Sequence, residues 1–396
     1  MISYSDRLSS RMSLIKPSAT VALTDKAKKL KKEGRDIVSM SAGEPDFSTP
    51  ENICAAAMVA INSGDTHYVA SRGIPELRSG IFKKLTEVNK IPLTSDEQIM
   101  VIPGAKAGLM FVTLALLSDG DECICPEPSW VSYRECVSFS GGKYVPVSSK
   151  GEDNFSITLE QLEEVVNDKT RLFILNSPVN PTGKVWTLAE LEMIAGFVKK
   201  HDLMVLSDEI YEDITYEESK HISFASLPDM AERTITLSGF SKAYAMTGWR
   251  LGYVVAPLEI TNAMLKIQQH STTCATSFVQ RAGVEAISNT ALKVVEMVEI
   301  FTKRRKLFLD NLSEIEGVKP FIPQGTFYLF LDISSFGLSS SEFANQFLEK
   351  EGVAVTPGAA FGESGEGYVR MSFAASDDDI NECCKRLSSF IDSLKN

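Results

Sequence analysis

Short β-rich runs alternate with amphipathic segments through the middle of the chain. The seven runs lie at residues 98–102, 122–125, 143–147, 171–175, 203–207, 234–238 and 252–256. Between several of them the apolar positions follow a 3.6-residue period, as at Leu188, Leu191, Ile194 and Val198 within 187–201. Strands that are separated by helices predict a largely parallel sheet with helices on both faces.

The pattern changes after about residue 288. Residues 291–315 read as one long helix, and shorter strands follow at 326–333 and 367–373. The first 47 residues hold a helix (21–33) and a short strand (36–39), which is too little to build a core alone. We therefore predict an α/β protein with a large domain over 48–290 and a smaller α+β domain built from both termini, 1–47 and 291–396.

Composition narrows the functional classes. The chain has 396 residues, of which 44% are apolar and 23% charged, as in soluble globular proteins. Its formal net charge of −12 argues against a nucleic-acid surface, which needs concentrated Lys and Arg. The longest apolar stretch, 109–117, is well short of the ~20 residues that span a bilayer, so we expect no membrane anchor.

The cysteines and histidines give no metal signal. The seven cysteines lack a CxxC spacing, and the four histidines are scattered, so we expect no metal site. An odd cysteine count without a secretory segment indicates reduced thiols and a cytoplasmic protein.

Residues 237–253 place one lysine, Lys242, in a run of small and apolar residues, with Arg250 eight positions later. Two interpretations are open. Lys242 is either a surface lysine whose stem covers apolar neighbours or a nucleophilic amine that forms a Schiff base with a carbonyl cofactor. Three other segments favour the second interpretation.

Polar residues follow two of the predicted strands. Asp208 directly follows the run at 203–207, and Tyr211 comes three residues later. Both lie at the strand edge where open parallel sheets bind ligands. A carboxylate there can hold a proton on a pyridine nitrogen, although a helix N-cap is the alternative. Asn180 precedes Pro181 and is held out of the helical region, so its amide either binds a ligand oxygen or belongs to a plain turn.

The third segment, 101–112, reads as a strand, a turn with Gly104 and a helix. Free N–H groups at such a helix start form an anion site that suits a phosphate. Arg250 could add a bidentate clamp on the same phosphate.

Together and in this order, these segments resemble the class I (aspartate-type, fold-type I) aminotransferase family, whose cofactor is pyridoxal 5′-phosphate (PLP). Further matching blocks are "KPSATVAL", "SAGEPDFSTP", "HYVASRGIPELRSGI", "EPSWVSY" and "PGAAFG". The lysine segment matches the family's attachment signature at Gly239, Ser241, Lys242, Gly248, Arg250 and Gly252. The resemblance implies the fold-type I PLP-dependent transferase fold, with a mostly parallel seven-stranded sheet in the large domain.

The resemblance also implies catalytic roles. Lys242 would carry PLP as a Schiff base and then move a proton as general acid and base. Asp208 would pair with the pyridine nitrogen, Tyr211 and Asn180 would bond the ring oxygen, and Trp130 would stack on the ring.

For the phosphate, the resemblance implies the turn after the first strand and residues near Lys242. It also implies a homodimer in which one side chain reaches the neighbouring subunit's phosphate. The residues are Gly104, Ala105, Lys106, Ser241 and Arg250 of one chain, and Tyr68 of the other. Gly239 and Ala105 depart from the family's usual serine and glycine at their positions.

Substrate recognition would need two anion sites. Arg370 would bind the α-carboxylate, helped by Asn180 and the backbone of Gly43. The chain has no arginine between 265 and 280, where one branch binds the distal carboxylate, and it resembles instead the branch with "KPSAT" and a lysine in the phosphate turn. In that branch the distal carboxylate would meet Lys106, Ser18 and Thr20.

The implied reaction is ping-pong transamination between aspartate or glutamate and a 2-oxo acid. The alternative within the same branch prefers prephenate, aromatic amino acids, alanine or kynurenine, because a fold does not fix a substrate. A regulator without turnover is a third interpretation. The acidic chain, which starts almost at once with aminotransferase-like sequence, argues against it.

Overall fold

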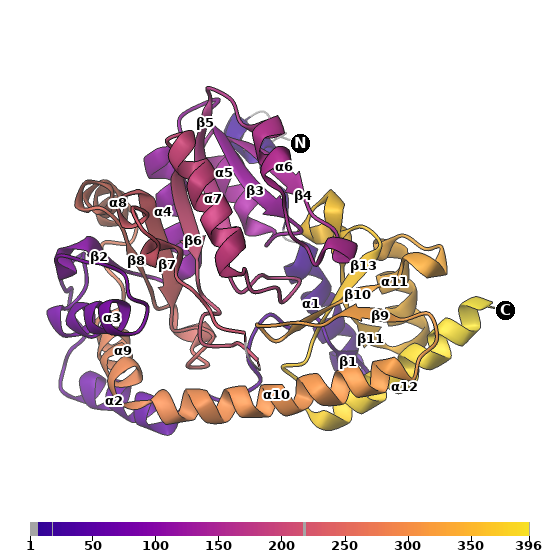
Figure 1. Cartoon of the computed structure of the whole chain (residues 1–396). Helices are drawn as coiled ribbons and strands as arrows, with labels where there is room; N and C mark the ends of the chain where they lie inside the picture. The colour runs from indigo at the N-terminus through magenta and orange to yellow at the C-terminus, as the bar shows by residue number, and fades with distance from the viewer. Residues whose placement is uncertain (1–6, 18, 217–218, 396) are drawn as a thin grey trace.

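The computed structural model describes residues 7–17, 19–216 and 219–395, with the side chains of 19–24 left out of the description. Figure 1 shows two sheets side by side, each with its own helices. The larger sheet has seven strands in the order β2-β8-β7-β6-β5-β3-β4. They are β2 (Ile99–Ile102), β3 (Glu122–Glu127), β4 (Lys143–Ser148), β5 (Thr170–Asn176), β6 (Met204–Asp208), β7 (Thr234–Gly239) and β8 (Gly252–Val255).

Each of the seven β-rich runs forms one of these strands, so the predicted sheet is confirmed. Strands β4, β3, β5, β6 and β7 pair in parallel, whereas β8 is antiparallel to both of its neighbours, β7 and β2. The sheet is therefore mostly parallel, and the carboxyl ends of its central strands meet at one edge.

Helices cover both faces of this sheet. Successive strand residues point to opposite sides, and in the central strands both sides are apolar. In β5, Leu172 and Ile174 pack with α4, α5 and α8, whereas Phe173 and Leu175 pack with α6 and α7. Helices α2, α3 and α9 cover the β2–β8 end. Their bounds are α2 (Glu51–Asn62), α3 (Pro75–Glu87), α4 (Ala105–Leu116), α5 (Ser132–Phe139), α6 (Leu159–Val165), α7 (Leu188–Lys200), α8 (Leu258–Ser271) and α9 (Ser277–Asn289).

A second core lies around an antiparallel sheet of order β12-β13-β10-β9. Figure 1 shows α10 running from the helices of the large sheet to this second sheet. The elements are β9 (Lys319–Phe321), β10 (Tyr328–Asp332), β12 (Thr356–Pro357), β13 (Tyr368–Ser372), α10 (Ala291–Ser313), α11 (Ser340–Glu351) and α12 (Asp377–Lys395).

The N-terminal segment packs on this second core. Strand β1 (Val38–Ser39) pairs in parallel with β11 (Val353–Ala354). Helix α1 (Ala19–Lys32) buries Ala27 in a small cluster with Leu348. The division near residues 47 and 290 stays a prediction, and these contacts between the two ends of the chain are consistent with it.

Short 3₁₀ turns connect the elements: η2 (Ser10–Ser13), η3 (Asp96–Gln98), η4 (Gly151–Asp153), η5 (Phe224–Ser226), η6 (Ala231–Arg233), η7 (Thr247–Trp249), η8 (Ser334–Phe336), η9 (Gly358–Phe361) and η10 (Glu363–Gly365). Among the described residues, no helix has the length and apolar character needed to cross a membrane.

Candidate active site

A cavity of about 430 Å³ lies where the carboxyl ends of β5, β6 and β7 face the second sheet. Its wall combines residues from both cores and from the N-terminal segment. Eleven residues expected from the sequence line it: Gly43, Ala105, Lys106, Trp130, Asn180, Asp208, Tyr211, Ser241, Lys242, Arg250 and Arg370.

Lys242 follows β7 and is half-buried in this wall. Its Nζ donates to the carbonyl of Gly43 at 2.5 Å and lies 5.7 Å from the centre of the Tyr211 ring. Burial lowers the pKa of Lys242 to about 8, although the nearby Glu44 carboxylate acts in the opposite direction. A substantial fraction of the amine is therefore neutral, and nucleophilic, near pH 8.

Asp208 is the last residue of β6 and is only 2% exposed. Its Oδ2 accepts from the Tyr133 hydroxyl at 2.7 Å, and its Oδ1 accepts from the backbone N–H of Ile210 at 3.2 Å. Burial raises the pKa of Asp208 to about 6, and these two hydrogen bonds limit the rise. The carboxylate is thus mostly ionised at neutral pH and fixed in direction.

Aromatic side chains surround these two groups. The Tyr211 hydroxyl hydrogen-bonds the Tyr328 hydroxyl at 2.9 Å. Trp130 is half-buried and packs edge-to-face on Tyr133, with ring centres 5.5 Å apart. The Nζ of Lys106 lies 5.0 Å from the centre of the Trp130 ring. A flat ring in the cavity would meet the Trp130 side chain on one side.

The part of the wall around the start of α4 suits an anion. Helix α4 begins at Ala105, and its N-cap, Gly104, has a φ of +86°. A Cβ added to Gly104 would lie 2.4 Å from Nη2 of Arg250, so only glycine lets the arginine approach the helix start this closely. Burial lowers the pKa of Lys106, and the Arg250 charge adds to that shift. Two cations and free helix N–H groups thus converge here.

The part of the wall around Arg370 suits a carboxylate. Arg370 of β13 is 3% exposed, and its guanidinium lies 4.2 Å from the centre of the Tyr328 ring. It donates to Oδ1 of Asn180 at 2.9 Å and to the carbonyl of Ser41 at 3.2 Å. Among the described residues, no carboxylate pairs with it, and its Nε is buried without a partner. A buried guanidinium with an open donor is a binding site for a carboxylate ligand.

Two expected residues do not line this cavity: Gly104, the N-cap of α4, and Tyr68. Tyr68 is 85% exposed in the loop after α2, so it does not reach the cavity of its own chain. Ser18 and the side chain of Thr20 lie outside the described residues.

Other residues that line the cavity were not predicted from the sequence. Tyr133 of α5 lies three positions after Trp130, and this closeness in the sequence could have placed both in the same wall. Tyr328 carries no local signal, because it reads as an ordinary strand residue. The remaining lining residues that the reasoning missed are Asp25, Lys28, Ser41, Glu44, Asn176, Ile210 and Thr247.

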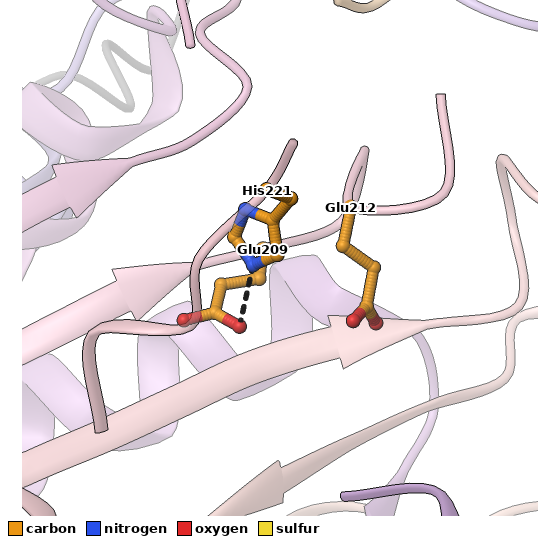
Figure 2. Close-up of side chains that lie close together, drawn as sticks. All are labelled: Glu209, Glu212 and His221. Atoms are coloured by element: carbon orange, nitrogen blue, oxygen red, sulfur yellow. Dashed lines mark hydrogen bonds and ion pairs between the residues drawn. The ribbon is translucent and has the colours of Figure 1, made fainter. Parts of the chain in front are cut away.

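A second group of polar side chains lies close to the turn that follows β6, away from the cavity. Figure 2 shows Glu209, Glu212 and His221 together, with a hydrogen bond between the His221 ring and Glu209. One potential ligand atom from each lies within 4.8 Å of the others. The Lys84 ammonium already contacts Glu212 at 2.8 Å, which opposes the binding of a metal ion.

Comparison with known proteins agrees with this geometry. The family model for aminotransferase class I and II matches residues 35–387. The chain is 42% identical to an aspartate aminotransferase of Pyrococcus abyssi and 40% identical to an aromatic-amino-acid aminotransferase of Thermococcus litoralis. Each match covers 98% of this chain and 99% of the relative.

Among solved structures, the aspartate aminotransferase of Thermus thermophilus with maleate is similar at a TM-score of 0.93 and 38% identity, covering 96% of this chain and 99% of that one. The extent of these matches exceeds what a shared fold alone would give. The chain is an aminotransferase and belongs to the class I and II aminotransferase family, in its aspartate aminotransferase-like branch.

Proposed function

We propose that this chain binds PLP at Lys242 and transfers the amino group of aspartate or glutamate to a 2-oxo acid. The observation that carries this proposal is the layout of one cavity. A half-buried lysine lies in the same wall as a cationic helix start, a buried carboxylate and a buried arginine that pairs with no carboxylate in the described part of the chain.

The side chains present fit PLP, the cofactor of the family. The cradle that a Cβ on Gly104 would fill, together with Arg250, Lys106 and Ser241, suits the phosphate. Asp208 suits the pyridine nitrogen, Trp130 the ring face, and Tyr211 and Asn180 the ring oxygen. When bound, PLP supplies an electron sink for the negative charge that develops at the substrate's Cα.

The protein's own groups then handle protons and charge. The Lys242 amine, whose pKa is about 8, would take the proton from the substrate's Cα and then act as the general acid that gives it back. The ionised Asp208 carboxylate would hold a proton on the ring nitrogen of the bound cofactor. Arg370 and Asn180 hold the α-carboxylate, so that the Cα–H bond points toward Lys242. The first product leaves before the second substrate binds, which gives ping-pong kinetics.

Substrate choice depends on the anion that the cavity accepts beside the α-carboxylate. Lys106 lines the cavity above Trp130 and can take the distal carboxylate of a dicarboxylic acid. The Thermus relative holds maleate, which is itself a dicarboxylate, whereas the Thermococcus relative is named for aromatic amino acids. The second candidate function is therefore transamination of prephenate, aromatic amino acids, alanine or kynurenine.

We also propose a cytoplasmic homodimer. Helix α2 exposes Met58, Val59 and Ile61 at 46–68%, and the exposed Tyr68 follows this helix. Covering these side chains with a second copy would remove apolar area from water. In that arrangement Tyr68 would contact the phosphate in the cavity of the partner.

The test combines a spectrum with substrate selectivity. The purified protein with PLP should be yellow, and its visible band should bleach on adding aspartate. Lys106→Met should lower kcat/KM for aspartate and glutamate about 10-fold or more, while phenylalanine and alanine change little. Equal losses for all four donors would contradict the distal-carboxylate role and favour the second candidate function.

A further inference from the structure

The turn that follows β6 has two polar faces. Asp208 and Tyr211 line the cavity, whereas the next residue after each does not: Glu209 is buried, and the Glu212 side chain is only 7% exposed. Figure 2 shows the two carboxylates beside His221. Glu209 and Glu212 thus lie directly after the two residues, Asp208 and Tyr211, that would face the cofactor.

Glu209 joins the turn to the segment around η5. It is fully buried, and its Oε1 accepts from the hydroxyls of Ser207 and Ser223, at 2.7 and 3.0 Å. The same atom accepts from the backbone N–H of Phe224 at 3.2 Å, and Oε2 contacts Nε2 of His221 at 3.0 Å. Both carboxylate oxygens therefore have fixed partners.

Glu212 joins the turn to α3 and β7. Its Oε2 accepts from Nζ of Lys84 at 2.8 Å and from the amide of Asn89 at 2.5 Å. Its Oε1 accepts from the Ser238 hydroxyl at 2.9 Å. Burial alone would lower the pKa of Lys84, but the Glu212 carboxylate, together with Asp213 and Tyr253, outweighs burial and raises the pKa. The pair thus stays charged although its side chains are only 14% and 7% exposed.

This arrangement leaves little place for a metal ion. All four carboxylate oxygens of the two glutamates already accept hydrogen bonds, and the Lys84 ammonium supplies the positive charge. The cluster is instead a closed ionic network. Such networks hold a discrete geometry when every member is satisfied, and here only Nδ1 of His221 is buried without a partner among the network atoms described.

We propose that Glu209 and Glu212 are positioning residues that hold the turn so that Asp208 and Tyr211 face the cofactor. The backbone supports this coupling, because the N–H of Glu212 donates to the carbonyl of Glu209 at 2.9 Å, which closes the turn. The Glu209 charge also contributes to the raised pKa of Asp208. Loss of either anchor lets the turn shift, and a misplacement of ~1 Å costs up to ~10²-fold in rate.

The proposal rests on the proposed function of Asp208 and Tyr211, so its test uses cofactor binding as well as turnover. The main variants are Glu212→Gln, which keeps the shape, and Lys84→Met, which removes the cation. The matched control is Arg78→Met, because Arg78 lies on the same helix as Lys84 and pairs with Asp96 at 3.3 Å, outside the network.

Three quantities are measured: the dissociation constant of the PLP-free apoprotein for PLP, by quenching of tryptophan fluorescence; the pH midpoint of the visible band of the loaded protein; and the melting temperature of the apoprotein. We expect Glu212→Gln and Lys84→Met to weaken PLP binding about 10-fold and to shift the pH midpoint. Arg78→Met should lower the melting temperature but leave the other two quantities unchanged.

The proposal is overturned if Glu212→Gln binds PLP with the wild-type constant and midpoint, or if Arg78→Met shifts both as much. If Lys84→Met does not fold, Lys84→Arg replaces it, and its retained charge should restore most of the wild-type behaviour. Failure of the wild-type protein to bind PLP would instead refute the proposed function, so the two failures are distinguishable.

Discussion

The floor and the mouth of the cavity differ in how firmly their polar groups are held. The floor is made by residues that are only 2–6% exposed: Asp208, Tyr211, Asn180 and Arg370. The mouth is made by residues that meet solvent: Asp25, Lys28, Gly43, Glu44 and Lys106.

The floor groups bind one another or their neighbours through short hydrogen bonds, so their directions are set before a ligand arrives. The mouth residues include charges of both signs that are exposed to water, which screens the interactions between them. This difference teaches where each part of the function resides. We propose that chemistry common to all substrates depends on the floor residues, whereas the choice between substrates depends on the mouth residues. Substitutions should therefore have large, general effects at the floor and small, selective effects at the mouth.

The largest effect is expected at the reacting amine above the floor. Lys242→Ala removes the group that moves the proton, so turnover should fall by at least ~10²–10⁴-fold for every substrate. The visible band of the bound cofactor should change as well, since no amine remains at this position to join it. Steady-state rates and an absorbance spectrum check both outcomes, with circular dichroism as the control for folding. Full turnover by this variant would remove the basis of the proposed function.

A smaller but still general effect is expected at Arg370. Arg370→Lys keeps the charge but loses the planar fork that binds a carboxylate with two hydrogen bonds. Charged hydrogen bonds are worth ~1.5–3 kcal/mol, so kcat/KM should fall ~10–10²-fold for all amino acids alike. PLP binding should stay intact. A loss confined to aspartate and glutamate would move Arg370 from the common chemistry to substrate selection.

The sequence predicted most of the floor because its residues follow strands. Asp208 ends a buried strand and Asn180 follows another, and the carboxyl ends of parallel strands meet at one edge. The seven strands were also predictable, since each is a short run of β-forming residues. The antiparallel direction of β8 was not specified, because apolar spacing carries no information on strand direction.

The residues that hold the floor residues in place were harder to predict, because their contacts form only when distant elements pack together. Tyr133 and Tyr328 hydrogen-bond Asp208 and Tyr211 from other elements. The local sequence of Tyr328 does not distinguish it from a core residue, and Tyr133 is marked only by its closeness to Trp130. Lys84 meets Glu212 across 128 positions, a contact that only the packing of α3 against the sheet creates. Asp25 and Lys28 lie on a helix whose polar face reads as plain solvent exposure.

A prediction of intermediate size separates function from stability at the floor. Burial raises the pKa of Asp208 from an ordinary 3.8 to about 6. A carboxyl group whose pKa is higher in the folded state than in the unfolded state makes its full contribution to folding stability below about pH 4. That contribution is lost as the pH rises through 6, where the buried group ionises. Asp208→Asn should therefore make the apoprotein more stable than wild type at pH 7.5, by at most ~3 kcal/mol, with the difference disappearing toward pH 4.

Melting temperatures of the two apoproteins across this pH range measure the difference, and activity assays should show that the more stable variant is the less active one. Tyr133→Phe serves as the comparison, because it removes the hydrogen bond to Asp208 but keeps the carboxyl group. A wild-type apoprotein that is more stable than Asp208→Asn at pH 7.5 would show that the carboxylate is better solvated than its burial indicates.

The smallest effect is expected at the mouth. Lys28 is exposed on α1 and lines the cavity, whereas its neighbour Lys29 pairs with Glu33 at 3.8 Å and does not. Exposed charges contribute up to ~1 kcal/mol, so Lys28→Ala should lower kcat/KM for aspartate and glutamate ~2–5-fold, and the loss should shrink at high salt. Phenylalanine should be unaffected, and Lys29→Ala should change neither donor. A loss well above tenfold would mean that the bound substrate removes Lys28 from water, because only a desolvated charge interacts that strongly. The helix that carries Lys28 would then close over the ligand, and Lys28 would be shielded from water as the floor residues are.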